Sequence, residues 1–193
     1  MAEQTYISSE GVKYRLIGTR KTTPITDSDA KIIKTQTVQI EVLVSDSVMR
    51  YMGSQFGHVA ISIDNDVYTR AHETYRKLDK YSYIHDSQQI KMKRDTLGIF
   101  LRVSPDERNN IKGELERRLQ LDKEFRLKHS EESSYSIINN NCSSNVADVL
   151  ENIGVQSHDP RFFNTPITPA ELASVLRKSK RVVKTHLYEA EKP

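Results

Sequence analysis

Cysteine occurs once in this chain of 193 residues, and tryptophan is absent. A single cysteine excludes an internal disulfide and any zinc site built on several thiolates. Long apolar runs are missing as well: no stretch of 18 apolar residues occurs, and the N-terminal segment lacks the apolar h-region of a Sec signal. We therefore expect no integral membrane segment and synthesis in the cytoplasm, with any export by a route that reads no Sec signal.

A strong excess of one charge is also missing. Lys and Arg number 29 against 26 Asp and Glu, which gives a net charge of +3 and a pI of about 8.9. The cations are interleaved with acids, so we expect no nucleic-acid partner. No repeat or linker divides the chain. We predict a single domain over residues 1–193, with a core at about 38–176 and an N-terminal extension, 1–36, to which the sequence assigns no role.

Alternation of apolar and polar residues marks the expected strands, and helix-capping sequences mark the expected helices. Strands are predicted at 38–44, 58–64, 67–72, 97–103 and 181–188, and the turn chemistry of Asp64-Asn65-Asp66 joins two of them in a hairpin. Helices are predicted after the cap sequences SPDE (104–107) and TPAE (168–171), and after the cysteine. The apolar stripe of the first helix is expected to comprise Ile111, Leu115, Leu119 and Phe125. Strands and helices fall in separate blocks, so the predicted class is α+β with a mostly antiparallel sheet.

The lone cysteine, Cys142, stands where the third of these helices begins, in the segment NNNCSSNV (139–146). The apolar residues that follow it have helical spacing: Val146, Val149, Leu150 and Ile153. Asn141 is a good N-cap, which places Cys142 in the first turn, where backbone N–H groups and the helix dipole favour a thiolate. Asn140 and Asn141 are candidates for holding an oxyanion or orienting the site. The competing interpretation is a cysteine that packs as a small hydrophobe.

A nucleophilic cysteine needs a base, and His58 is the best candidate among six histidines. It begins a strand after Gly57 and shares a face with the small residues Ala60 and Ser62. If the hairpin has a three-residue loop, His72 lies directly opposite His58 and would orient it. With a two-residue turn we expect Glu73 in that place instead, and we favour His72.

The remaining histidines are expected to be ordinary polar residues, because each lies in a polar or charged stretch: His85, His129, His158 and His186. His58 and His72 could supply two metal ligands, but no motif such as HExxH accompanies them. We therefore expect neither a metal nor another cofactor.

With FGHVAISID (56–64) first and NNNCSSNVADVLENIG (139–154) later, the chain resembles the circularly permuted papain-like cysteine hydrolases of the NlpC type. The resemblance runs from about 38 to 176 and includes TPITPAELASVL (165–176). It implies a papain-like fold with a central sheet packed against the cysteine helix, Cys142 as nucleophile and His58 as base. The third, orienting residue varies in this clan, so the resemblance permits His72 without requiring it.

The chemistry that the resemblance implies is hydrolysis of an amide by acyl transfer. In bacteria the clan is best known for cell-wall peptidases, and a small hydrolase without a signal is similar to the type VI secretion toxins that cleave peptidoglycan peptide stems. That interpretation implies delivery to a target-cell periplasm, with an immunity protein or secretion machinery as partners. The alternatives are a protein-deconjugating peptidase or deamidase, a lipid acyltransferase of the same fold, and an inert papain-like binding module. The retained His58 argues against the last of these.

Overall fold

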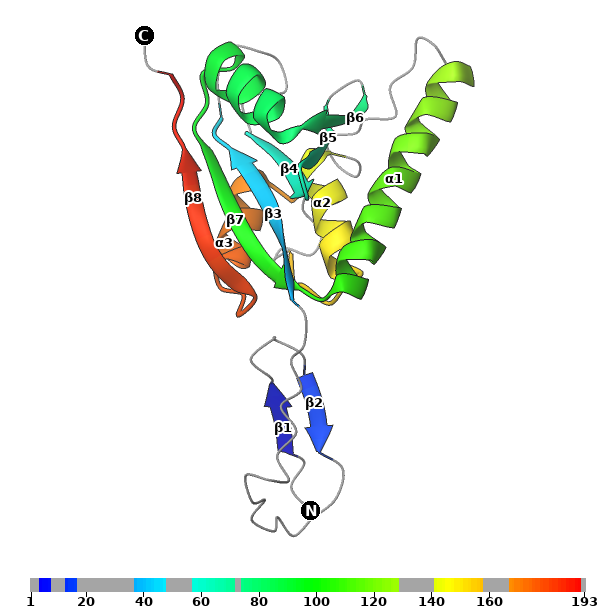
Figure 1. The fold of residues 1–193 in the computed structure, drawn as a ribbon, viewed down its shortest axis with the longest axis vertical. Coiled ribbons are helices and arrows are strands. Elements are labelled where there is room, and N and C mark those ends of the chain that lie inside the picture. Colours follow the sequence, from blue (N-terminus) through cyan, green and yellow to red (C-terminus); the bar gives the residue numbers. More distant parts are fainter. Residues whose placement is uncertain are drawn as a thin grey trace.

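The computed structural model describes residues 4–7, 13–16, 37–47, 57–71, 74–128, 141–157 and 167–191. Its main feature is a six-stranded sheet in which all neighbouring strands are antiparallel (Figure 1). The strand order is β6 (Tyr75–Asp79), β5 (Asp66–Arg70), β4 (His58–Ile63), β3 (Val38–Ser45), β7 (Thr96–Val103) and β8 (Val182–Tyr188). The α+β class and the predicted strands of this sheet are confirmed, apart from differences of one or two residues at strand ends.

Two further strands lie in the N-terminal segment and form a separate antiparallel pair. They are β1 (Gln4–Ile7) and β2 (Lys13–Leu16). The sequence had given no assignment to this segment. Strand backbone therefore occurs within the predicted extension as well as within the predicted core.

Three helices pack on one face of the large sheet. They are α1 (Pro105–Lys128), α2 (Cys142–Glu151) and α3 (Pro169–Leu176). Their apolar side chains meet inward-facing residues such as Val42, Val59 and Ile61 in the main hydrophobic core. The predicted caps are confirmed: Ser104 and Glu107 exchange side-chain-to-backbone hydrogen bonds of 3.1 and 2.8 Å, and the Thr168 side chain accepts from the backbone N–H of Glu171.

The stripe of α1 differs from the predicted one at its end. Ile111, Leu115 and Leu119 are buried as expected, but the fourth buried position is Asp122, and Phe125 is only partly buried. The Asp122 carboxylate is tolerated there because the buried Arg70 on β5 forms an ion pair with it. The helix thus continues its inward face with a charged pair where the sequence pattern suggested an aromatic ring.

The opposite face of the sheet carries a second, smaller apolar cluster. Tyr83 and Ile84 come from η1 (Ser82–Lys91), a wide helical segment, and pack against Leu43, Ala60 and Val67 of the sheet. Neither η1 nor β6 was predicted. Within the described residues, no helix combines the length and the apolarity needed to cross a membrane.

Candidate active site

The first turn of α2 forms as its sequence predicts. Asn141 is the N-cap, with φ −99° and ψ 177°, and its side chain accepts from the backbone N–H of Ser144 at 2.8 Å. The hydroxyl of Ser144 accepts in return from the backbone N–H of Asn141 at 3.0 Å. The capping box engages the N–H groups of Asn141 and Ser144, and the first backbone hydrogen bond of the helix runs from Asn145 to Asn141, so the N–H groups of Cys142 and Ser143 lie ahead of the intrahelical hydrogen bonds. Two donors therefore remain at the position of the thiol.

Cys142 is buried, with 7% of its surface exposed, and it is a free thiol. Burial by itself raises the pKa of this thiol. The positive charge of His58, a hydrogen bond with His58 and the backbone N–H of Val59 outweigh that effect, so the pKa falls from the ordinary 9.0 to about 7. The structure therefore brings the predicted nucleophile and the predicted base together, and about half of the thiol is ionised at neutral pH.

His58 owes its position to the glycine that precedes it. Gly57 has a φ of +83°, and a Cβ atom there would lie 2.6 Å from the carbonyl oxygen of Ser45. Only glycine accepts both the positive φ and this close approach of backbone. His58 then begins β4 directly opposite Ser45 on β3.

The partner of His58 on the hairpin is Thr69, which the sequence interpretation missed. The Thr69 hydroxyl lies 2.6 Å from His58 Nε2, and Thr69 is 4% exposed. Because Nε2 contacts Thr69, Nδ1 is the ring nitrogen available to Cys142. This hydrogen bond fixes the plane of the imidazole, which is the role that sequence analysis had assigned to a third residue.

The hairpin register explains why Thr69 was missed. The turn has two residues, Asp64 and Asn65, and the strands pair Ala60 with Thr69 and Ile63 with Asp66. If this pairing is continued by two residues away from the turn, Ala71 lies opposite His58. The predicted three-residue loop is therefore wrong. The expectation of Glu73 for a two-residue turn is wrong too, because a shorter turn moves the pairing toward the turn.

Three candidate site residues, His72, Glu73 and Asn140, lie outside the described residues. His129 and His158 lie outside them too. The other two histidines are far from catalytic geometry: His85 stacks on Tyr81 and pairs with Asp86, while His186 contacts the ring of Tyr188. No group of three potential metal ligands occurs among the described residues.

The thiol also has a buried polar neighbourhood on the η1 side. Tyr83 is 2% exposed, and burial together with the negative charge of Cys142 raises the pKa of its hydroxyl. Burial lowers the pKa of Arg94, whereas the charges of Tyr83 and Cys142 raise it. Both residues lie between the predicted strands 67–72 and 97–103, in a stretch for which neither a strand nor a helix was predicted.

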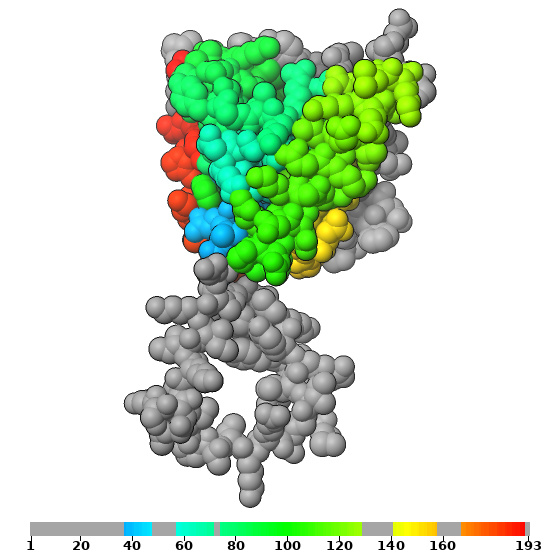
Figure 2. Space-filling view, turned by 45° about the vertical axis from the view of Figure 1, so that its right-hand side comes forward, coloured from blue at the N-terminus to red at the C-terminus, as the bar shows by residue number. Residues whose placement is uncertain are grey.

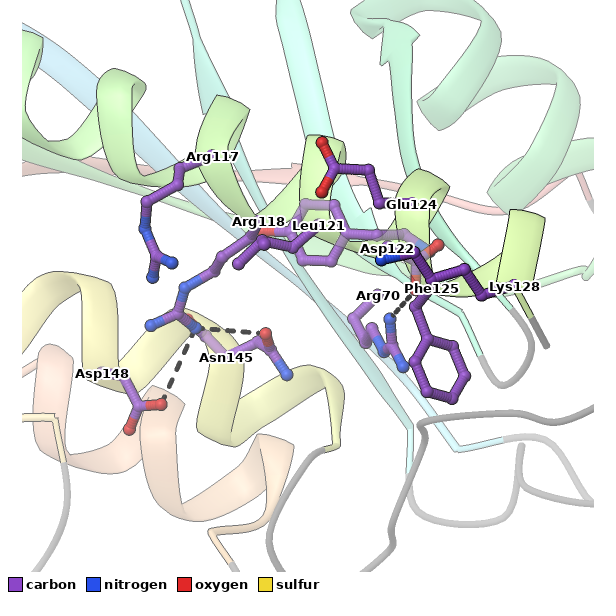
Figure 3. A pocket seen from close by; sticks show the side chains of 11 residues that line it. Arg70, Arg117, Arg118, Leu121, Asp122, Glu124, Phe125, Lys128, Asn145 and Asp148 are labelled. Atoms are coloured by element: carbon purple, nitrogen blue, oxygen red, sulfur yellow. Dashed lines mark hydrogen bonds and ion pairs between the residues drawn. The ribbon is translucent and has the colours of Figure 1, made fainter.

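A pocket of about 560 Å³ lies between α1 and α2. Figure 2 shows the outer surface of α1 with α2 beside it, and Figure 3 shows the arginines of α1 directed into the space between the helices. Arg70 of β5 and Asn145 of α2 also line the pocket. Each is close in sequence to a site residue, since Arg70 follows Thr69 and Asn145 lies one turn after Cys142.

Comparisons with known proteins bear on the fold. No family model matches the chain, and no curated protein matches it. Among solved structures, the crystal structure of the type VI secretion system effector TseH is similar, with a TM-score of 0.51 and 13% sequence identity. The match covers 78% of this chain and 98% of that one. At this identity the likeness concerns the fold.

Proposed function

We propose that this chain is a cysteine hydrolase of permuted papain-like fold that cleaves an amide bond by acyl transfer. The observation that carries the proposal is the position of the buried Cys142 thiol, in the first turn of α2 and in hydrogen-bond contact with His58, which lowers the pKa of the thiol to about 7. A packing cysteine in an apolar site would have its pKa raised instead. The chain order supports the permuted arrangement, because the histidine strand β4 precedes the cysteine helix α2.

The geometry supports a sequence of steps that balances. The Cys142 thiolate attacks the carbonyl carbon of the substrate amide, and the electron pair of the C=O bond moves to oxygen. The N–H groups of Cys142 and Ser143 are available to hold this oxyanion. His58 Nδ1–H donates its proton to the leaving amine as the C–N bond breaks. His58 then takes a proton from water, which attacks the acyl-enzyme and releases the acid and the thiolate.

Thr69 takes the orienting role in this scheme. The Thr69 hydroxyl oxygen can accept from Nε2–H, which is present in the protonated imidazole and in the neutral tautomer that presents an unprotonated Nδ1 to the thiol. It adds no charge, unlike a carboxylate. Asn141 supports the site as the helix cap, whereas His72, Glu73 and Asn140 stay candidates for additional contacts with substrate or base.

For the substrate we propose the peptide stems of peptidoglycan, with the protein acting as a type VI effector in a target-cell periplasm. Two points support this choice: the sequence resembles a clan best known for cell-wall peptidases, and the fold is similar to that of the type VI secretion system effector TseH. An effector of this class would have an immunity protein and secretion machinery as partners.

A digest of purified bacterial sacculi tests the proposal. Wild-type protein, Cys142→Ala and His58→Ala are incubated with sacculi of several peptidoglycan chemistries, and soluble products are identified by mass spectrometry. We expect new stem-peptide fragments from the wild type alone, and their masses locate the cleaved bond. Equal products from Cys142→Ala would refute the nucleophile. No products from any protein would refute the peptidoglycan substrate, and isopeptide conjugates and acyl lipids would then be assayed in the same way.

A further inference from the structure

The charged groups that line the α1–α2 pocket are largely paired with one another. Asp122 pairs with Arg70 and with Arg126, and its carboxylate also accepts the backbone N–H of Tyr75 at 3.0 Å. Arg118 is held between Glu114 on its own helix and groups of α2. The charged groups of this pocket are therefore bound to one another, and the Arg118 side chain extends from α1 to form hydrogen bonds with α2 (Figure 3).

Arg118 makes a defined set of contacts across the two helices. Its Nε donates to Glu114 Oε1 at 2.7 Å, which fixes the start of the guanidinium. Its Nη1 donates to both the backbone oxygen and the side-chain Oδ1 of Asn145, each at 3.1 Å. The Arg118 side chain is only 18% exposed. These are charge-assisted bonds in a partly dehydrated place, where they are stronger than on an open surface.

Asn145 passes this constraint on to the first turn of α2. With Oδ1 held by Arg118, the Asn145 amide is oriented so that Nδ2 donates to the backbone oxygen of Asn141 at 2.8 Å. The backbone N–H of Asn145 donates to the same oxygen at 3.1 Å. The Ser144 hydroxyl donates to this oxygen as well, at 3.1 Å. Among the described residues the carbonyl of the N-cap residue thus has three donors, and the shortest of these bonds comes from a side chain that is held from another helix.

Holding the Asn141 carbonyl also holds a backbone donor of the candidate active site, the N–H of Cys142. The carbonyl of Asn141 and the N–H of Cys142 belong to one peptide unit, and that unit is planar. Fixing the direction of the carbonyl therefore fixes the direction of the Cys142 N–H, which points the opposite way. In the proposed function this N–H is a donor to the oxyanion, and such donors act only when they are held in place beforehand.

We propose that Arg118 is a positioning residue for the active site, and that it aims the Cys142 N–H at the oxyanion through Asn145 and the Asn141 carbonyl. The effect of Arg118 on catalysis rests on the proposed function, whereas its effect on the direction of the Cys142 N–H does not. The relay also explains why Asn145 is 8% exposed on a helix that could have placed an apolar residue there.

The neighbouring arginine supplies a matched control. Arg117 donates to Glu114 from Nε and Nη2, each at 2.7 Å, but among the described residues it forms no hydrogen bond or ion pair with α2. Arg118→Met and Arg117→Met therefore remove the same charge and a contact with the same carboxylate. Asn145→Ala breaks the next link and serves as a second variant if Arg118→Met folds poorly.

Because the chain has one cysteine, selective ¹⁵N-cysteine labelling gives a single amide cross-peak, which reports on the Cys142 N–H without any substrate. We expect this peak to move in Arg118→Met and Asn145→Ala and to stay in place in Arg117→Met. A peak that moves equally in both arginine variants, or in neither, would overturn the proposal.

Kinetics provide the catalytic readout. Alkylation by iodoacetamide needs the thiolate but no oxyanion donor, whereas amide hydrolysis needs both. We expect Arg118→Met to lower kcat about 10- to 100-fold with little change in KM, since a misdirected donor is less costly than a deleted one. Alkylation should stay within about threefold of the wild type if the thiolate itself is unaffected. Parallel loss of both reactions would contradict the aiming role. Absence of hydrolysis in the wild type would refute the proposed function, and the cross-peak would still decide the structural part.

Discussion

The hydrogen bond between Thr69 and His58 offers the sharpest single-atom test of the site. Thr69→Val keeps the shape of the side chain and removes the hydroxyl that lies 2.6 Å from Nε2. A hydrogen bond to a charged group contributes about 1.5–3 kcal/mol. Its loss destabilises the imidazolium of the thiolate–imidazolium pair by that amount, which corresponds to about one to two pKa units on Cys142.

The expected consequence is a slower thiol at neutral pH. With a pKa of about 7, the wild-type thiol is about half ionised at pH 7, and the variant would be about a tenth ionised or less. Alkylation by iodoacetamide, followed by intact-protein mass, should therefore slow at least about fivefold at pH 7. The two proteins should come closer together at pH 9, where the variant thiol also ionises.

Thr69→Ser is the matched control, because it keeps the oxygen and removes only a methyl group. It should alkylate at the wild-type rate. Thr69→Val that also alkylates at the wild-type rate at pH 7 would refute the orienting role of Thr69, and one of the undescribed candidates, His72 or Glu73, would then take its place.

Three further expectations concern stability. Gly57→Ala forces a Cβ to within 2.6 Å of the Ser45 carbonyl oxygen at a φ of +83°, so urea melts should show a loss of about 1–3 kcal/mol or more. Arg70→Met leaves Asp122 buried without its main partner and should lower the free energy of unfolding by about 3 kcal/mol; an unchanged melt would show that the pair is dispensable. The lowered pKa of Cys142 makes the folded state release its proton more readily than the unfolded one. The stability of the wild type relative to Cys142→Ala should therefore rise by about 2 kcal/mol between pH 7 and pH 9, and this contribution should be lost as the pH falls through 7.

Helix starts could be predicted from the sequence because capping is local chemistry. Ser104, Asn141 and Thr168 each satisfy backbone N–H groups within three residues of themselves, and all three caps form as expected. The position of Cys142 in a first turn follows from the same rule. Its meeting with His58 depended on tertiary packing of α2 against β4, which only the resemblance to a known clan could indicate.

The elements that escaped prediction lack a local signal. In η1 the buried residues are Tyr83, Ile84 and Gln88, and only the first two carry an apolar or aromatic side chain, which is too few to mark an apolar helix stripe in the sequence. The strand β6 lies at the sheet edge and carries mostly exposed charged residues, so no alternation marks it. The segment η1 packs against the sheet and β6 pairs with β5, and neither of these tertiary contacts is visible in the local sequence.

The predicted partner of His58 depended on whether the hairpin turn has two residues or three. Asp64-Asn65-Asp66 is compatible with a loop of two or of three residues, and each length selects a different partner for His58. Asp64 adopts a φ of +59°, which closes the shorter turn and brings Thr69 within reach. The sequence pattern thus predicted both strands of this hairpin but not the register in which they pair.

If Cys142 is the nucleophile, hydrolysis passes through a covalent acyl-enzyme on its sulfur, and this species can be trapped. Soluble disaccharide peptides from sacculi are mixed with the protein, the reaction is quenched in acid within the first turnover, and the intact mass is recorded. We predict an increment equal to the acyl fragment minus one hydrogen, located on the peptide that contains Cys142 and absent in Cys142→Ala. Hydrolysis that proceeds with no adduct, and at the same rate in Cys142→Ala, would contradict the account.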